Sequence, residues 1–313
     1  MREERRVGVA NSSYFRISVI SKCNLACQFC HREGNYARLE EILTPQEIQF
    51  ACKVALKAGF NKFKITGGEP TEREDLDVIV SLLSQLHLPD LSMITNGTNL
   101  VALSQKLWNA GLRRINVTLN TLDPKRFQQF RPKKGIDVQS IVKGIEVAKQ
   151  AGFEHLKINF VFFDKDSEKD LEDLIEFVRK TNLTLVVLPV INDNRLYSLD
   201  DMYNLIKTYG IRSEEIIVDN EGLRKRNIYL NGGGTVLLRI DELAWKRPYS
   251  FCSKCANSLQ CREGIFPIRL SANGELIPCM ADFEHRINVR NILRNRDEDG
   301  LKEAFRKITL WQQ

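Results

Sequence analysis

Short apolar runs alternate with longer amphipathic segments along the first two thirds of the chain. From about residue 14 to residue 219, runs rich in β-branched and aromatic residues predict strands, and helical periodicity follows all of them but the last within a few residues. Such alternation predicts a parallel sheet with helices outside it. The predicted strands are Tyr14–Ile20, Lys62–Thr66, Leu91–Thr95, Arg114–Leu119, Leu156–Phe162 and Thr184–Val190.

The number of strand–helix units decides between two α/β architectures. Six units are too few to close an eight-stranded barrel, so we predict an open partial (βα)6 barrel. The alternative is a doubly wound nucleotide-binding sheet. It is disfavoured because no glycine-rich dinucleotide fingerprint opens the first helix. In a barrel, the functional loops are expected at the carboxyl ends of the strands.

Local signals mark where several helices begin and end. The run Thr44-Pro-Gln-Glu47 offers a capping threonine, a proline at the first helical position and a glutamate three residues after the cap. Ala-Gly pairs at Gly59, Gly111 and Gly152 predict helix ends before the next strand. Cys52 lies in an apolar helical stretch, so we expect it to be a small core side chain.

The pattern changes after residue 220, where two hairpins are predicted. The glycines of Asn231–Gly234 favour a turn between strands at 227–230 and 235–240, although a phosphate cradle is the alternative. Asn273-Gly274 predicts a second turn, between Ile265–Ser271 and Glu275–Cys279. We therefore predict a barrel domain over residues 1–221 and a small cysteine-rich domain over residues 222–313.

Composition limits the class of protein. With 43% apolar and 27% charged residues, the chain has the composition of an ordinary globular protein. No apolar stretch is long enough for a membrane span, and the first residues lack the apolar core of a secretory signal. Eight cysteines without an export signal favour metal ligation in a reducing cytoplasm over disulfides. The net charge of +6 suits an anionic partner or simply a solvated surface.

Three cysteines follow the first predicted strand, with the spacing Cys23-x3-Cys27-x2-Cys30. A structural zinc site needs four protein ligands. A [4Fe–4S] cluster has four iron corners, and three thiolates would leave one iron open. The alternatives are a zinc knuckle, a disulfide loop or three unrelated thiols.

This spacing resembles the signature of the radical S-adenosylmethionine (SAM) superfamily. The resemblance implies that the open iron chelates the amino and carboxylate groups of SAM. One electron from an external donor, such as ferredoxin or flavodoxin, would then cleave SAM to methionine and a 5′-deoxyadenosyl radical. That radical abstracts a hydrogen atom from the substrate. The resemblance also makes Cys23, Cys27 and Cys30 the catalytic cluster ligands.

Further positions match the SAM site of this superfamily. Gly67-Gly68-Glu69-Pro70 matches the glycine motif that receives the SAM amino group, and glycines let backbone approach a ligand closely. Phe29 matches the aromatic position that packs on the adenine. Thr118 matches a hydroxyl position near the SAM carboxylate or ribose, with an ordinary strand threonine as the alternative.

A second cysteine group lies near the end of the chain. Cys252, Cys255, Cys261 and Cys279 supply four thiolates, enough for a cluster or a zinc ion. On spacing alone a zinc ribbon would be favoured. The stretch from Cys261 to Cys279, with Gly274 between them, resembles the twitch or SPASM extensions of radical SAM enzymes. That resemblance implies an auxiliary [4Fe–4S] cluster held by three or four of these cysteines.

Most of the chain, from Phe15 to about Leu293, resembles the GTP 3′,8-cyclase (MoaA-type) family of molybdenum-cofactor synthesis. The matching stretches are Phe15–Ser18, Cys23–Cys30, Ile65–Pro70, Thr95–Thr98, Arg114–Asp123, Val147–Phe153, Lys157–Asn159 and Ile268–Cys279. A ring of cations suits a triphosphate because charge-assisted contacts are strong. The resemblance implies that the substrate is held by Arg16, Lys64, Thr95, Lys157 and Arg269.

Four features depart from the cyclase pattern. Val186 and Pro267 stand where the family has arginines, and the chain ends at Leu310-Trp-Gln-Gln313 rather than with a Gly-Gly tail. An insertion at 256–265 carries Cys261, which could close the auxiliary iron that the family leaves open for its purine. We therefore expect hydrogen abstraction from an anionic nucleotide, nucleoside or sugar-like molecule, with GTP as the best single named substrate.

Two other functions stay open at this point. One is a SPASM/twitch enzyme that modifies a peptide or protein side chain. The other is a zinc-binding or nucleic-acid-binding module, for which the basic clusters Arg224–Arg226 and Arg286–Arg296 would serve. These clusters lack interleaved aromatic residues for base stacking, so a nucleic-acid partner is not expected. Neither a membrane partner nor a particular oligomeric state is expected from the sequence.

Overall fold

A computed structural model describes residues 14–34, 42–130, 135–190, 198–218, 224–240, 250–255, 267–280, 282 and 284–311. Its centre is a run of six parallel strands that neighbour one another in chain order. All six predicted strands are confirmed, with ends within two residues of the expected ones. They are β1 (Tyr14–Ser18), β2 (Lys62–Thr66), β3 (Leu91–Thr95), β4 (Arg114–Thr118), β5 (His155–Phe162) and β6 (Thr184–Pro189).

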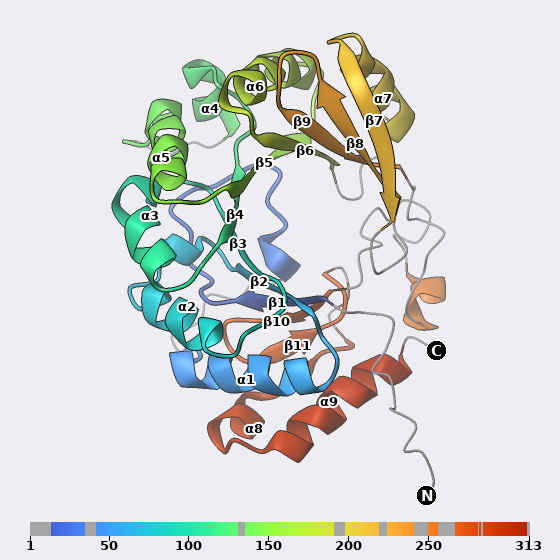
Figure 1. Cartoon of the computed structure of the whole chain (residues 1–313). Helices are drawn as coiled ribbons and strands as arrows, with labels where there is room; N and C mark the ends of the chain where they lie inside the picture. Colours follow the sequence, from blue (N-terminus) through green and yellow to red (C-terminus); the bar gives the residue numbers. More distant parts are fainter. Residues whose placement is uncertain are drawn as a thin grey trace, which may run out of the picture.

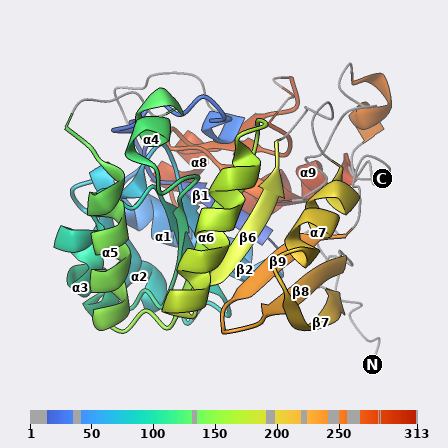
Figure 2. The same cartoon turned by 90° about the horizontal axis from the view of Figure 1, so that it is seen from above.

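Helices cover the outer side of this curved sheet (Figures 1 and 2). They are α1 (Pro45–Lys57), α2 (Leu76–Ser84), α3 (Leu100–Asn109), α4 (Pro124–Phe130), α5 (Val138–Gln150) and α6 (Ser167–Thr181). The predicted capping box of Thr44 and Glu47 is present at the start of α1, and Cys52 is fully buried in that helix. The three Ala-Gly pairs end α1, α3 and α5 as predicted. The partial-barrel prediction is therefore confirmed.

Alternation along each strand separates an apolar core from a polar concave face. In β1, Phe15 and Ile17 are buried in the hydrophobic core, while Arg16 lies on the opposite face of the strand. In β2, Phe63 joins the same core and Lys64 lies beside Arg16 in the strand register. Charged side chains are thus placed on the side of the sheet that the outer helices leave uncovered.

Strands from the last third of the chain extend the same sheet at both edges (Figure 1). β9 (Thr235–Arg239) lies parallel to β6 and pairs with β8 (Arg224–Leu230), which pairs with β7 (Ile211–Val218). On the other edge, β10 (Ile268–Leu270) lies parallel to β1 and is followed by β11 (Glu275–Ile277) and β12 (Ile287–Asn288). Both predicted hairpins are confirmed, and the glycine run at 231–234 forms a turn.

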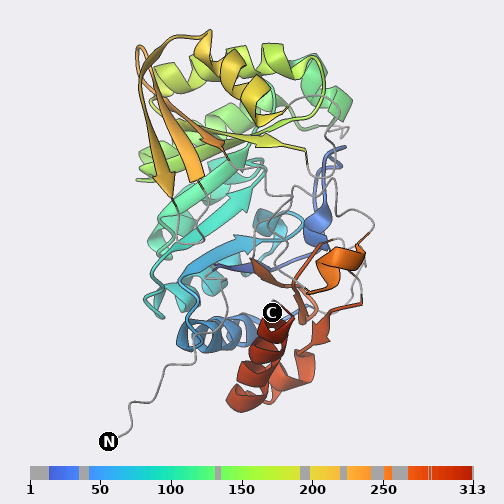
Figure 3. The ribbon, with the colours of Figure 1, turned by 90° about the vertical axis from the view of Figure 1, so that its right-hand side faces the viewer.

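The predicted domain boundary at residue 221 stays a prediction, and the sheet is continuous across it. Neither α7 (Leu199–Lys207) nor strand β7 was predicted from the sequence. At the other end, α8 (Arg290–Arg294) and α9 (Glu298–Leu310) pack against α1 (Figure 3). The ring of Phe305 in α9 lies 5.6 Å from that of Phe15, so the C-terminal segment completes the core beneath β1. Among the described helices, none is long and apolar enough to cross a membrane.

Candidate functional site

The cysteine loop, residues 19–31, leaves β1 at its carboxyl end, which is where the barrel prediction placed a functional loop. Cys23 and Cys30 are exposed and Cys27 is partly buried. A backbone bond from Cys30 to the Cys27 carbonyl, 3.2 Å long, folds the end of the loop into a turn. The Sγ atoms of Cys23 and Cys30 accept backbone N–H groups from Leu25 and Arg32, each at 3.4 Å.

The glycine motif after β2 packs directly against the start of this loop. The N–H of Gly68 donates to the Ile20 carbonyl at 2.7 Å, and the N–H of Glu69 donates to the Lys22 carbonyl at 2.9 Å. A Cβ atom on Gly67 would overlap the Ile20 carbonyl, and one on Gly68 would overlap the Lys22 carbonyl. The two glycines therefore allow the loop after β2 to join the loop that carries the cysteines.

Glu69 is 1% exposed and receives hydrogen bonds on both carboxylate oxygens. Oε1 accepts the hydroxyl groups of Thr71 and Thr95, each at 2.6 Å, and Oε2 accepts the N–H of Asn96 at 2.7 Å. Burial raises the pKa of Glu69, and these donors oppose the rise. Thr95, expected to contact substrate, is buried and uses its hydroxyl on Glu69 and on the N–H of Gly97.

Asn24 ties the cysteine loop to the loop after β3. Its Oδ1 accepts the Asn96 side-chain amide at 2.7 Å, and its own amide donates to the Thr98 hydroxyl at 2.8 Å. Since Asn96 also donates its N–H to Glu69, one polar network joins the loops after β1, β2 and β3. Neither residue was predicted from the sequence, although Asn24 lies between the first two cysteines and Asn96 lies in a matching stretch.

The three thiols have a spacing that suits a cluster. Although Cys23 is exposed as a residue, partial desolvation of its thiol raises its pKa to about 11, and nearby Glu69, Cys27 and Cys30 raise it further, whereas the Leu25 N–H lowers it. In the part of the chain that the structure describes, no three histidine, cysteine, aspartate or glutamate side chains surround one metal-ion position. The thiolates of a [4Fe–4S] cluster each bind a different iron. Three thiols on one loop, two of them with N–H donors to sulfur, are a suitable donor set.

Phe29 faces an aromatic residue that the sequence analysis did not identify. Its ring centre lies 5.6 Å from that of Phe163, which follows β5. Pro70 is the first residue of the short helical turn Pro70–Glu72, which Glu69 caps. Thr118 ends β4 opposite Asn159 in the strand register. The predicted SAM-site residues thus lie at or after the carboxyl ends of β1, β2 and β4.

Arg16, Lys64 and Arg269 occupy one register row across β10, β1 and β2. Arg16 and Arg269 both contact the carboxylate of Glu33, which lies three residues after Cys30. Burial alone would raise the pKa of Glu33, but Arg16, His31 and Arg269 hold it at about 2. Glu33 was not predicted, because nothing in its local sequence indicates partners from strands so distant in the chain.

A second group of cations lies on the same face of the sheet and shares Lys64 with the first. Burial lowers the pKa of Lys157 in β5, and the nearby charges of Arg114, Lys64 and Lys225 lower it further. These residues come from strands that are not all neighbours in the sheet, so the curvature brings them within electrostatic range. Arg114 also pairs with Asp90. The predicted Lys64 and Lys157 therefore belong to one cationic face.

The second cysteine group is only partly described. Cys252 lies on the short helical turn Ser250–Lys254, and Cys255 follows it and donates its N–H to the Cys252 carbonyl at 3.2 Å. Cys279 follows β11, and Cys261 lies outside the described residues. The auxiliary cluster accordingly stays a prediction.

Comparisons with known proteins agree on one family. Residues 17–178 match the family model described as the Radical SAM superfamily. A "Probable GTP 3′,8-cyclase" of Methanococcus aeolicus is 34% identical over 289 residues, covering 90% of each chain. A protein of the same description from Pyrococcus abyssi is 33% identical over 304 residues, covering 94% of each chain.

Solved structures share the fold at lower identity. SuiB of Streptococcus suis bound to S-adenosylmethionine matches with a TM-score of 0.61 and 18% identity, over 94% of this chain and 66% of that chain. The structure titled "Native anSMEcpe with bound AdoMet" matches with a TM-score of 0.58 and 15% identity, over 94% of this chain and 82% of that one. At such identities these matches support the fold alone.

Proposed function

The chain belongs to the radical SAM superfamily, and on this premise we propose that Cys23, Cys27 and Cys30 hold a [4Fe–4S] cluster whose fourth iron binds SAM. A radical SAM enzyme requires both groups. The cysteine loop supports the assignment in two ways. Its three thiols lie on one loop, and Gly67 and Gly68 allow the backbone before Glu69 to pack directly against that loop. When bound, the cluster supplies the electron that cleaves SAM.

Glu69 is proposed to receive the SAM ammonium group. A buried carboxylate is a strong acceptor for a cation, and the hydrogen bonds from Thr71, Thr95 and Asn96 hold both of its oxygens in place. Phe29 is proposed to pack on the adenine and Thr118 to lie near the ribose or carboxylate. Phe29 lies in the loop after β1, Thr118 is the last residue of β4, and Glu69 follows β2, so all three lie at the carboxyl-terminal side of the sheet.

The substrate is proposed to be an anionic nucleotide, nucleoside or sugar-like small molecule, with GTP as the first candidate. The observation that carries this proposal is the cationic concave face, where Lys64, Arg114 and Lys225 lie within electrostatic range of Lys157. Their repulsion of Lys157 is relieved when an anion binds beside it. The relatives described as probable GTP 3′,8-cyclases support the choice of GTP.

Arg16 in β1 and Arg269 in β10 are proposed to bind the same anion. Both already contact Glu33, so an incoming phosphate has to share or replace that carboxylate. The family assignment leaves no reason to propose a zinc-binding or nucleic-acid-binding module. The peptide-modifying alternative gains no support from the structural neighbours, because they share only the fold.

Three further assignments complete the proposal. An auxiliary [4Fe–4S] cluster is assigned to Cys252, Cys255 and Cys279, with Cys261 as a possible fourth ligand. An external one-electron reductant such as ferredoxin or flavodoxin is assigned because the cluster must be reduced before it cleaves SAM. A cytoplasmic location is assigned because thiolate ligands need a reducing compartment.

The test is turnover by the anaerobically reconstituted protein with dithionite, SAM and GTP. A GTP cyclase-like enzyme yields 5′-deoxyadenosine together with a cyclised purine product. Formation of 5′-deoxyadenosine with unchanged GTP would exclude GTP while leaving the radical SAM chemistry intact. No SAM cleavage at all, in protein with a full iron content, would overturn the assignment of the cysteine loop.

A further inference from the structure

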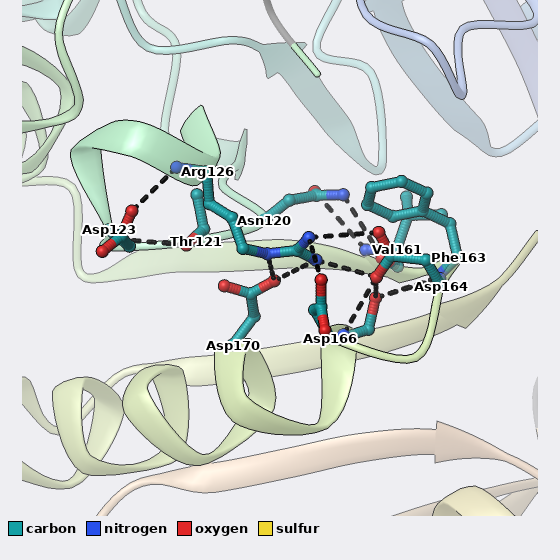
Figure 4. Close-up of polar contacts among 10 residues, drawn as sticks. Asn120, Thr121, Asp123, Arg126, Val161, Phe163, Asp164, Asp166 and Asp170 are labelled. Atoms are coloured by element: carbon teal, nitrogen blue, oxygen red, sulfur yellow. Dashed lines mark hydrogen bonds and ion pairs between the residues drawn. The ribbon is translucent and has the colours of Figure 1, made fainter. Parts of the chain in front are cut away.

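Arg126 connects two loops at the carboxyl end of the barrel and stands apart from every residue predicted from the sequence. It lies in α4, after β4, and its guanidinium faces the loop after β5 and the start of α6 (Figure 4). Its Nη2 lies 2.7 Å from Asp164 Oδ1 and 2.7 Å from Asp170 Oδ2. Its Nε donates to the same Asp170 oxygen at 2.8 Å.

We define this clamp as Arg126, Asp164 and Asp170. The side chain of Arg126 is 15% exposed and that of Asp170 is 3% exposed, whereas that of Asp164 is 36% exposed. A planar guanidinium that bonds two carboxylates at once fixes their relative position, which a flexible lysine does not. Asp166 also contacts Arg126, at 3.2 Å, but its side chain is 76% exposed, so this contact is the weak member.

The clamp holds the segment that carries Phe163. Asp164 accepts the Ser167 hydroxyl at 2.9 Å, and that hydroxyl in turn accepts the backbone N–H of Phe163 at 3.2 Å. The Arg126 guanidinium also lies over the Phe163 ring, 5.9 Å from its centre. The position of Phe163 therefore depends on groups that Arg126 anchors.

Phe163 and α4 both touch the cysteine loop. The Phe163 ring lies 5.6 Å from the Phe29 ring, which immediately precedes Cys30. The Gln28 side chain donates to the Gln129 carbonyl of α4 at 3.3 Å. The cysteine loop, α4 and the loop after β5 therefore all contact one another, and Arg126 links α4 to the loop after β5.

We propose that Arg126 is a positioning residue for SAM: by clamping Asp164 and Asp170 it fixes Phe163 against Phe29, and the two rings form one aromatic wall for the adenine. This inference rests on the proposed function, since it needs SAM at the cysteine loop. A ring held in place binds a flat heteroaromatic group without the cost of ordering it first. Arg126 acts through Phe163 and does not itself contact SAM.

The experiment measures the equilibrium dissociation constant of SAM for the anaerobically reconstituted protein, with iron content and thermal unfolding midpoint recorded for each variant. Arg126→Ala and Phe163→Ala are each expected to weaken SAM binding by about five- to tenfold, the size of one aromatic contact. Arg126→Lys is expected to resemble Arg126→Ala because an ammonium on a flexible chain lacks the planar donor fork that fixes the two carboxylates relative to each other. Asp166→Asn is the matched control and is expected to stay within about twofold of wild type.

The double variant Arg126→Ala/Phe163→Ala separates positioning from a general loss of structure. If Arg126 acts through Phe163, the double variant binds SAM about as weakly as Phe163→Ala alone. Additive losses, or wild-type affinity in Arg126→Ala, would overturn the inference. A wild-type protein with a full iron content that fails to bind SAM would instead refute the proposed function.

Discussion

Arg16 and Glu33 form a largely buried ion pair, with Arg16 Nε 3.0 Å from Glu33 Oε2. Arg269 approaches the same oxygen at 3.3 Å from the neighbouring strand. One carboxylate after the cysteine loop thereby pairs with two cations that were expected to hold substrate. Because it competes with any anionic group for these cations, Glu33 is expected to weaken the binding of anions.

The variant Glu33→Gln keeps the shape of the side chain and removes its charge. We expect tighter binding of inorganic triphosphate and a lower KM for GTP, since Arg16 and Arg269 lose their competing carboxylate. Breaking a buried pair should also lower the free energy of unfolding, on the order of 3 kcal/mol. Isothermal titration with triphosphate and urea unfolding measure the two effects. The control is Glu303→Gln, which breaks an exposed pair with Arg306 and should cost under about 1 kcal/mol.

The same pair predicts a pH dependence of stability. Burial alone would raise the pKa of Glu33 above its ordinary 4.5, but Arg16, His31 and Arg269 bring it to about 2 in the folded protein. The contribution of Glu33 is therefore complete above about pH 4.5 and is lost as the pH falls toward 2, by up to about 3 kcal/mol. The difference in unfolding free energy between wild type and Glu33→Gln should shrink between pH 6 and pH 3. A constant difference would contradict this interpretation.

The variant Gly68→Ala tests the junction between the glycine motif and the cysteine loop. The new methyl group would overlap the Lys22 carbonyl, which is backbone and cannot rotate away. We expect the cysteine loop to shift, with loss of iron from the reconstituted protein and weaker SAM binding. The control is Gly135→Ala, where a Cβ meets no atom within 4 Å but the φ of +84° imposes backbone strain. It should be destabilised and should keep its iron; equal iron loss in both variants would show that the junction has no special role.

The role expected for Thr95 from the sequence differs from the contact that its side chain makes in the structure. Resemblance assigned it to substrate, whereas its hydroxyl donates to Glu69 at 2.6 Å. In Thr95→Val the buried carboxylate loses one donor, which costs about 1.5–3 kcal/mol for a bond to a charged group. We expect the KM for SAM to rise more than tenfold and the KM for GTP to change little. The reverse pattern, measured by 5′-deoxyadenosine formation at varied SAM and varied GTP, would favour a direct substrate contact.

Local sequence predicted the barrel well because each of its strands is specified by a short apolar run, and because the Thr44 capping box and the Ala-Gly pairs mark helix ends. β7 was not predicted because it is an edge strand with Arg212, Glu214 and Glu215 in its sequence and, among the described strands, pairs only with β8. Its exposed side chains give no apolar alternation, so the strand depends on partners that form later in the chain. The same holds for the parallel pairing of β10 with β1, which no local pattern encodes.

Site residues also divide into those that local sequence predicts and those that depend on the whole fold. The cysteines and glycines could be identified because their spacing in the sequence reflects the geometry of the loops that carry them. Glu33, Asn24 and Phe163 could not, since each acquires its role from a contact made across the fold, such as the one between Glu33 and Arg269, 236 positions apart. Such contacts follow from strand order, which is a property of the whole chain.

Iron content tests the second cysteine group, because its fourth candidate ligand lies outside the described residues. Two [4Fe–4S] clusters give about eight irons per wild-type chain. Cys252→Ala is expected to retain about four and still cleave SAM, since it affects only the auxiliary cluster, whereas Cys27→Ala is expected to retain about four and cleave no SAM. Cys52→Ala is the control: that thiol is fully buried in α1, so its loss should leave all the iron. A wild-type protein with about four irons and one zinc would instead make the second group a zinc site.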